Sequence, residues 1–258
     1  MFISRLLNAA LVAVILISSP SAFTQVLEEV VVTAQIREQS LQDVPISVSA
    51  ISGEDIADRS VDNLQSLSAS VPNFMVVETQ IDTSISIRGV RSGANKGFEQ
   101  SVPMNFDGIV YPRSQLARTP LVDLERVEVL RGPQPTLFGK NAIGGAVSVT
   151  SAKPTEEFEG KFSTSHESEH GEDQSLLVLS GPLSDNLLGR LTVSTREMDG
   201  WITNTKMKRL EPQRDETYIR GQLAWTSGDV DYNLKVETAD FDSLGYAMEA
   251  IAPQDGYG

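Results

Sequence analysis

The chain has 258 residues, with 35 acidic and 21 basic side chains and a formal net charge of −14. Such an acidic chain is a poor partner for nucleic acid, because a protein that binds nucleic acid needs a basic surface against the phosphates. Cysteine is absent, which excludes disulfides and thiolate chemistry, and the length allows one or two domains.

Residues 1–23 have the three-part layout of a secretory signal peptide. Arg5 supplies the positive charge at the start, an apolar stretch runs from Leu6 to Ile17, and small residues follow it. We place the cleavage site near Ser21 to Thr24. The alternative is a membrane anchor, although the apolar stretch is short for a span. No other stretch resembles a transmembrane helix, so any further membrane contact has to be made by strands.

Residues 27–154 mix short helices and strands. LEEVVVTA (27–34) is β-branched and extended, and VPISVSAI (44–51) alternates as a strand does. Ser52 then begins a capping-box-like helix start, S-G-E-D, with carboxylates in the first turn. A second helix is predicted over residues 60–67.

Further strands follow in the same region. Residues 84–90 predict one strand, and residues 102–111 predict two short strands about an Asp107-Gly108 turn. Residues 121–130 predict a short helical turn that runs into a strand, and AVSVTS (146–151) predicts the last strand. The pattern indicates a compact α+β domain.

RGPQPTLFGKN (131–141) contains two glycines and a lysine, as a phosphate-binding loop does. Six residues separate Gly132 from Gly139, however, and Asn141 stands where the Mg²⁺-binding hydroxyl is needed. Pro133 and Pro135 have no N–H to offer a phosphate, and a strand-like segment follows where a helix is required. The sequence therefore excludes a nucleotide site here.

After Pro154 the sequence alternates strictly between apolar and polar residues. In residues 187–201, for example, Leu191 and Val193 lie on one face of a strand, and Arg190 and Arg196 lie on the other. An apolar face opposite a charged one is typical of an outer-membrane β-barrel wall. A soluble sandwich is the alternative, but its buried face would not tolerate so many charges. Short turns at PLSDN and SGD alternate with a longer loop, TNTKMKRLEPQR.

Several motifs resemble, in order, those of the N-terminal part of a TonB-dependent outer-membrane receptor. They are EEVVVTA (28–34), DVPISVSAISGEDI, IRGV (87–90), DGIVY (107–111), LERVEVLRGPQPTLFGKNAIGGAVSVTSAKP and GPLSDNLLGRLTVSTREMDGW. The one departure is Pro135, where the family usually has glycine. The resemblance implies a signal peptide (1–23), a TonB box and linker (24–40), an α+β plug domain (41–155) and the first antiparallel strands, about five, of a truncated transmembrane β-barrel (156–258).

The resemblance also implies a function without catalysis, cofactor or resident metal. A plug gates the lumen of an outer-membrane barrel of a Gram-negative bacterium, and TonB supplies energy for active uptake of a scarce ligand. The default ligand is an iron–siderophore complex, and cobalamin, other metals and oligosaccharides stay open. The expected partners are TonB of the TonB-ExbB-ExbD system, outer-membrane lipid and a small metal chelate, with no nucleic acid.

Three groups of residues carry these expectations. An extended segment placed before the plug suits strand addition to TonB, although it could also be the first strand of the plug. In the plug, two arginines are implied to face barrel carboxylates as a charge latch, and a third group on two loops is expected to contact the ligand. The TonB group is Glu29, Val30, Val31, Val32 and Thr33; the latch is Arg88 and Arg131; the ligand group is Arg91, Lys96, Tyr111, Arg113 and Arg118.

Two rival functions remain. HESEH (166–170) matches the H-E-x-x-H pattern of zinc proteases, which requires a helix to bring both histidines to one face. The flanking sequence predicts strands instead. The second rival is a periplasmic module that consists of the plug alone and binds ligand or competes for TonB.

Overall fold

The computed structural model describes residues 31–32, 39–40, 46–78, 83–93, 97, 99–169 and 171–245. These residues belong to one compact unit, Val31–Gly258. The predicted signal peptide lies outside them, as do Glu29, Val30, Thr33 and Lys96. No helix of the described part is long and apolar enough to cross a membrane.

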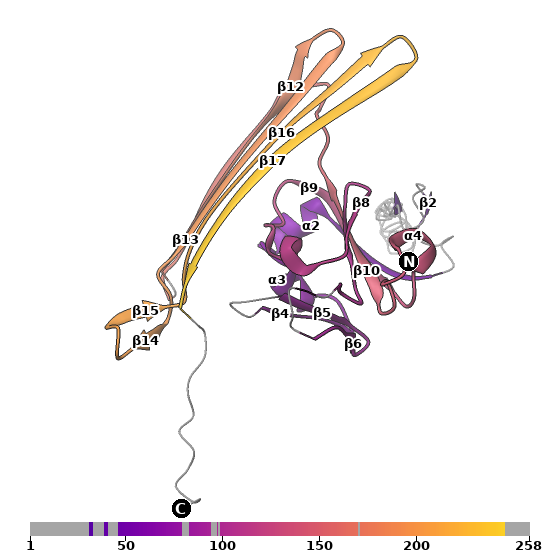
Figure 1. Cartoon of the computed structure of the whole chain (residues 1–258). Coiled ribbons are helices and arrows are strands. Elements are labelled where there is room, and N and C mark those ends of the chain that lie inside the picture. The colour runs from indigo at the N-terminus through magenta and orange to yellow at the C-terminus, as the bar shows by residue number, and fades with distance from the viewer. Residues whose placement is uncertain are drawn as a thin grey trace, which may run out of the picture. The chain divides into compact units, whose positions relative to one another are not determined.

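A mixed sheet of five strands forms the centre of the first domain (Figure 1). Its order is β3-β9-β10-β7-β8, in which β10 runs parallel to β7 and the other neighbours are antiparallel. The strands are β3 (Ser47–Ser52), β7 (Met104–Phe106), β8 (Ile109–Tyr111), β9 (Leu124–Arg131) and β10 (Gly145–Ser151). The predicted Asp107-Gly108 turn joins β7 to β8, and both residues have the positive φ that such a turn needs.

Two short helices follow β3. Helix α2 (Gly53–Asp58) begins as predicted, because the Ser52 hydroxyl accepts a hydrogen bond from the Asp55 N–H at 3.0 Å. The second helix begins later than predicted, as α3 (Leu64–Ser68). Ser60 has a φ of +52° and ends the preceding turn, whereas Asn63 forms a reciprocal capping box with Ser66.

A second sheet of three strands has the order β4-β5-β6. Its strands are β4 (Phe74–Glu78), which the sequence analysis did not predict, β5 (Thr83–Ile87) and β6 (Val90–Arg91). The prediction of one strand over 84–90 is wrong, because Arg88 and Gly89 both have positive φ and turn the chain back. The result is a tight hairpin.

Residues 121–123 do not form the predicted helical turn. The Leu121 N–H donates to the distant Asp62 carbonyl at 2.8 Å, and Asp123 has a φ of +53°, which is left-handed backbone, so the segment forms no helical turn before β9. A 3₁₀ helix, η1 (Ser114–Arg118), lies just before it.

The apolar residues of β9 and β10 divide between the two faces of the mixed sheet. Val127, Val129 and Val147 join the larger core, to which α2 and α3 contribute Ile56 and Leu67. On the other face Leu130 and Ala146 pack with Phe138 of α4 (Pro135–Phe138). Period-two alternation thus produces a sheet that is buried on both faces.

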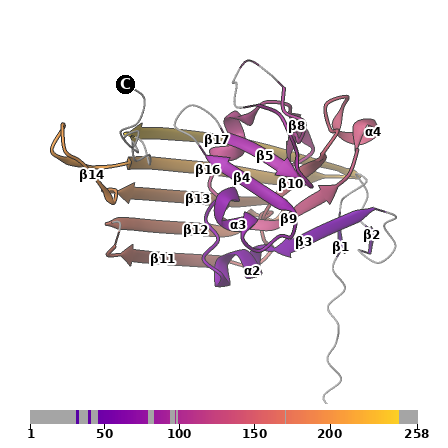
Figure 2. The same ribbon diagram turned by 90° about the horizontal axis from the view of Figure 1, so that it is seen from below.

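A long antiparallel sheet follows, with the order β11-β12-β13-β16-β17 (Figure 2). Its strands are β11 (Glu159–Glu167), β12 (Glu172–Ser184), β13 (Leu187–Met198), β16 (Gln213–Ser227) and β17 (Val230–Leu244). Two-residue turns join β12 to β13 and β16 to β17. The longer predicted loop contains its own small hairpin, β14 (Ile202–Asn204) with β15 (Arg209–Glu211).

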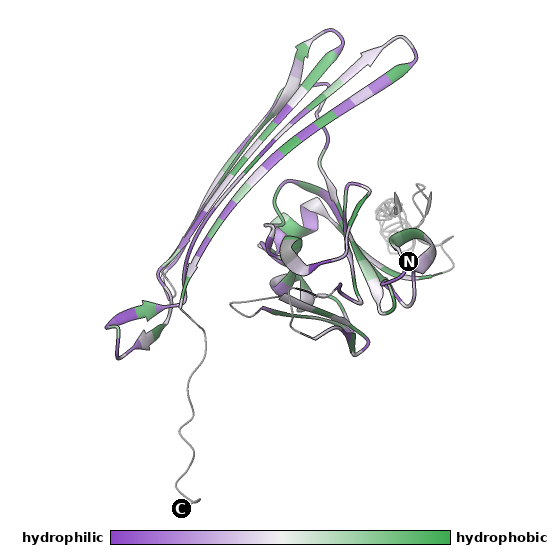
Figure 3. Ribbon diagram, viewed as in Figure 1, coloured by the Kyte–Doolittle hydropathy of each residue, from purple (hydrophilic) through white to green (hydrophobic). Residues whose placement is uncertain are grey.

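Hydropathy alternates along each strand of the long sheet (Figure 3). Arg190, Thr192 and Arg220 are less than a tenth exposed, whereas Leu234 and Val236 are 58% and 64% exposed. Here the polar side chains are buried against the first domain, and the apolar ones form the outward face. This inverted arrangement is the one predicted for a barrel wall.

Candidate functional site

The predicted TonB-contact segment is described only in part. Val31 and Val32 form β1 (Val31–Val32), which pairs antiparallel with β2 (Gln39–Ser40). Among the described residues this pair is a sheet of its own, separate from the mixed sheet. The segment therefore has an extended backbone, and its contact with TonB stays a prediction.

The loop 131–141 contains one helical turn, and hydrogen bonds join its first residues to the residues that follow it. The Gly132 N–H donates to the Gly144 carbonyl at 3.1 Å, and the Gln134 N–H donates to the Ala142 carbonyl at 2.8 Å. Pro135 stands at the start of α4, where its missing N–H costs nothing. Strand β10 follows the loop, and a Cβ at Gly145 would lie 2.1 Å from the Leu130 carbonyl oxygen. Glycine is thus needed here for close strand approach, not for phosphate.

The structure brings Arg88 and Arg131 together. Arg131 donates to the hydroxyls of Ser49 at 2.6 Å and Ser47 at 3.3 Å, and to the Pro72 carbonyl at 3.3 Å. Burial, and after it the charge of Arg88, lowers the pKa of Arg131. Two adjacent cations attract an anionic group, but the barrel carboxylates of the predicted latch stay a prediction.

The two loops expected to contact ligand are tied to each other, because the Gln100 N–H donates to the Pro112 carbonyl at 2.6 Å. Arg91 and Arg113 are exposed. Tyr111 is half-buried and packs edge-on against Phe106. Arg118 lies 3.9 Å from the Glu78 carboxylate, so part of its charge is balanced within the domain.

A buried ionic cluster, which we name the Asp123 cluster, joins the first domain to the long sheet. It consists of Asp123, Arg190, Thr192 and Arg220. The Asp123 carboxylate accepts hydrogen bonds from Arg190 Nε and Arg220 Nη2, both at 2.9 Å, and from the Thr192 hydroxyl. Arg220 also donates to the Ser151 hydroxyl at 3.1 Å. The side chains of Asp123, Arg190 and Arg220 are each 5% exposed or less.

The environment of Asp123 favours its charged form. Burial by itself raises the pKa of a carboxyl group, but hydrogen bonds from Arg190 and Thr192 and the charges of Arg190 and Arg220 outweigh it. The pKa of Asp123 therefore lies below the usual value of 3.8. Asp107 behaves in the same way, because Lys235 and Ser151 offset its burial.

Three further carboxylates of the first domain meet bases on the long sheet. Asp62 lies 3.2 Å from Arg196, Glu78 lies 3.0 Å from Arg214, and Asp107 lies 2.6 Å from Lys235. All four acids thus face strands β13, β16 and β17. In these pairs the plug supplies the acid and the wall supplies the base, which is opposite in sign to the predicted latch, and the pattern was not predicted from the sequence. The signal available was the bases on the polar faces of β13, β16 and β17, which are Arg190, Arg196, Arg214, Arg220 and Lys235.

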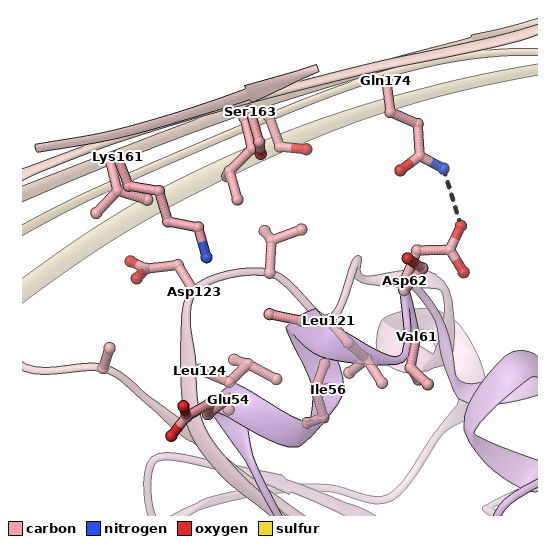
Figure 4. A pocket seen from close by; sticks show the side chains of 18 of the residues that line it. Glu54, Ile56, Val61, Asp62, Leu121, Asp123, Leu124, Lys161, Ser163 and Gln174 are labelled. Atoms are coloured by element: carbon pink, nitrogen blue, oxygen red, sulfur yellow. Dashed lines mark hydrogen bonds between the residues drawn. The ribbon is translucent and has the colours of Figure 1, made fainter. Parts of the chain in front are cut away.

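A cavity of about 570 Å³ lies beside the Asp123 cluster (Figure 4). Helix α2 and the segment 121–124 line one side, and strands β11 and β12 line the other with short polar side chains such as Ser163. Gln174 spans it and donates to the Asp62 carboxylate at 3.0 Å. Short wall side chains therefore leave space between α2 and the long sheet.

The structure contradicts the zinc-protease alternative. His166 and Glu167 lie in strand β11, where neighbouring residues point to opposite faces, and His166 Nδ1 is 2.8 Å from Asp173. His170 lies outside the described residues. Among the residues that are described, no group of three or more His, Cys, Asp or Glu side chains is placed to hold a metal ion.

Relatives of the chain are outer-membrane receptors. The iron-regulated outer membrane virulence protein of Vibrio cholerae is 34% identical over 201 residues, which cover 71% of this chain and 30% of that protein. The pesticin receptor of Yersinia pestis is 28% identical over 210 residues, which cover 79% of this chain and 31% of that receptor. The chain thus spans about a third of the length of the curated relatives it matches.

Solved structures share the fold. The ferric yersiniabactin uptake receptor of Yersinia pestis superposes with a TM-score of 0.66 at 24% identity, over 75% of this chain and 31% of that one. A chain of the complex of FpvAI with pyocin S2 gives a TM-score of 0.72 at 19% identity, over 84% of this chain and 27% of that one. The family model described as TonB-dependent Receptor Plug Domain matches residues 40–146. The chain therefore belongs to the family of TonB-dependent receptors of the Gram-negative outer membrane, with a plug domain followed by antiparallel strands of the barrel wall.

Proposed function

We propose that this chain is part of a receptor that takes up a scarce ligand across the outer membrane with energy delivered by TonB. The observation that carries the proposal is the set of four ionic contacts between plug carboxylates and bases on β13, β16 and β17. A plug held against the polar side of the wall blocks the lumen. Uptake then requires work on the plug, and the outer membrane has no nucleotide pool to supply it.

The ligand of the proposed receptor is an iron–siderophore complex. Support comes from a relative that is named as an iron-regulated outer membrane protein. Arg91, at the end of β6, and Arg113 are exposed at two adjoining loops, where their charges suit an anionic metal chelate. Lys96, in the first of these loops, adds a third cation in our proposal.

The contact with TonB is made by residues 29–33. A β-branched, extended segment offers its backbone to the edge of a partner's sheet, and hydrogen bonds along the strand provide the affinity. Val31 and Val32 already have strand geometry in the structure. A pull on this segment is transmitted to the plug through the chain that follows it.

Transport is tested in cells that have this receptor as their only route for siderophore-bound iron. We expect radioactive iron, supplied with a panel of siderophores, to enter only when both TonB and the receptor are present. Arg113→Ala is expected to weaken binding of the accepted complex, and Arg59→Ala, an exposed arginine of the plug that pairs with Asp55, serves as the control. Iron uptake that does not depend on TonB would refute the proposal.

The TonB contact is tested separately by cross-linking. The chain contains no cysteine, so single-cysteine variants at residues 29–33 can be paired with cysteines in the periplasmic domain of TonB. We expect disulfides at residues 29–33 and none at Glu38→Cys. Equal cross-linking at all these positions would show that no defined strand pairing exists.

No observation favours the alternative of a soluble plug-only module. Apolar side chains on the outward face of the long sheet are exposed, including Leu234 at 58% and Val236 at 64%. A soluble module would leave them in water, whereas lipid covers them in a membrane.

A further inference from the structure

The outward face of the long sheet is not flat but contains an apolar hollow of about 450 Å³. It extends over strands β12, β13, β16 and β17. The side chains that surround it are Phe158, Leu183, Leu191, Leu223, Leu234 and Val236. Each of them is between 39% and 79% exposed. These residues lie on the side that faces lipid in a barrel wall.

Two glycines, Gly189 and Gly221, lie on the floor of the hollow. Gly189 pairs with Leu223, and Gly221 pairs with Leu191 on one side and Val236 on the other. A Cβ built at Gly221 would meet nothing within 4 Å. The floor is therefore bare backbone at Gly221, whereas the side chain of Leu183 already lies over Gly189, where a Cβ would be 2.8 Å from it. The leucines and the valine around the floor form the rim.

An aromatic pair indicates how deep in the membrane the hollow lies. The rings of Trp225 and Tyr232 stack with centroids 5.2 Å apart, and these residues form the third cross-strand pair from the short turn between β16 and β17. Aromatic rings of this kind mark the membrane–water interface, and short turns mark the periplasmic end of a barrel. The next outward pairs along the strands are Leu223 with Leu234 and then Gly221 with Val236. The hollow thus begins just on the hydrocarbon side of the interface.

We propose that the hollow is a binding site for one acyl chain of a phospholipid in the periplasmic leaflet of the outer membrane. The side chains around it are apolar, so they match a hydrocarbon chain and offer nothing to a headgroup. Arg190 contributes to the floor, but its guanidinium is bound to Asp123 on the opposite face. In the hollow an acyl chain makes van der Waals contacts with the floor and with the rim on several sides, whereas on a flat wall it makes contacts on one side only. This site does not depend on the proposed transport function.

The test uses isolated outer membranes that contain the protein and a phospholipid with a photoreactive diazirine near the middle of one acyl chain, at the depth of the hollow. After irradiation, mass spectrometry locates the adducts. We expect adducts to concentrate on the rim residues Leu223, Leu234 and Val236. Phe162, which is 71% exposed on the same face but outside the hollow, is expected to carry few.

A filled-hollow variant provides the second measurement. Gly221→Leu places a side chain in the open space, and we expect it to abolish the rim adducts. Thr195→Leu adds a leucine to the same face outside the hollow and is expected to leave them unchanged. Equal labelling of the rim and Phe162 in the unmodified protein would mean ordinary lipid contact and would overturn the proposal, even if the variant failed to fold. Protein–protein adducts at the rim would overturn it as well, in favour of a second copy or another partner.

Discussion

The plug domain and the wall sheet use the same period-two alternation to bury opposite kinds of residue. In the plug, Val127 and Val129 of β9 are 0% exposed. In the wall, Arg220 is 2% exposed and Val236, which extends to the other face, is 64% exposed. Alternation therefore tells which residues share a face, and the medium on each side decides which face is buried.

This inversion determines what holds the two regions together. A polar wall face cannot contribute a hydrophobic core to the plug, so the contact is ionic and has to be matched group by group. Buried ion pairs add little net stability over apolar packing, but loss of one partner is costly because the other charge stays buried. The Asp123 cluster is therefore suited to specify where the plug docks.

The substitution that we expect to weaken the contact between plug and wall sheet most strongly is Asp123→Asn. It leaves Arg190 and Arg220 buried without their shared carboxylate, which costs about 3–5 kcal/mol. We expect the plug of this variant to be digested faster by protease in isolated outer membranes. Asp58→Asn, which removes an exposed carboxylate from α2 beside the same cavity, is the control. Equal digestion of the two variants would show that the cluster does not hold the plug.

A pair of leucines sharpens the comparison between the two regions. Leu67 of α3 is 0% exposed in the plug core, so Leu67→Ala leaves a cavity and costs about 2–5 kcal/mol. Leu234→Ala on the outward wall face leaves no cavity, because lipid fills the space, and we expect a clearly smaller loss. Denaturant unfolding of both variants in lipid vesicles measures the difference. A loss at Leu234 as large as at Leu67 would mean that the outward face is packed against protein.

Local signals in the sequence predicted most of the strands. The alternation around Arg190 and the Asp107-Gly108 turn are examples, because both depend on neighbouring residues only. The hairpin at Arg88-Gly89 was missed, because Arg88 continues the polar positions of the strand before it, although Gly89 and Val90 break its alternation. The start of α3 was misplaced, since Ser60 and Asn63 are both good capping residues and only the structure shows which of them caps.

The contacts of Asp123 could not be predicted from sequence in the same way. Its partners lie 67 and 97 residues away, and no spacing rule links them. The predicted latch residues did come together, as Arg88 and Arg131, but the bonds seen for Arg131 go to serine hydroxyls and a carbonyl. Pairing across two domains depends on how they dock, which a strand pattern does not encode.

Lowering the pH is the mildest way to probe the contact between the plug and the wall sheet. The direction of the pKa shift of Asp123 determines the expected result. The pKa of Asp123 is lowered below 3.8 in the folded protein. Its contribution to stability is therefore fully present above pH 3.8 and is lost only as the pH falls through the lower folded-state pKa. We expect resistance of the plug to pepsin to be unchanged down to about pH 3.8, the pKa of an ordinary aspartate, and to fall below it. The Asp123→Asn variant has no carboxyl group to protonate at this position. Its resistance to pepsin should therefore be lower and should not show the further fall that protonation of Asp123 causes. A loss of resistance in the unmodified protein already above that pH would mean that other groups hold the plug on the wall.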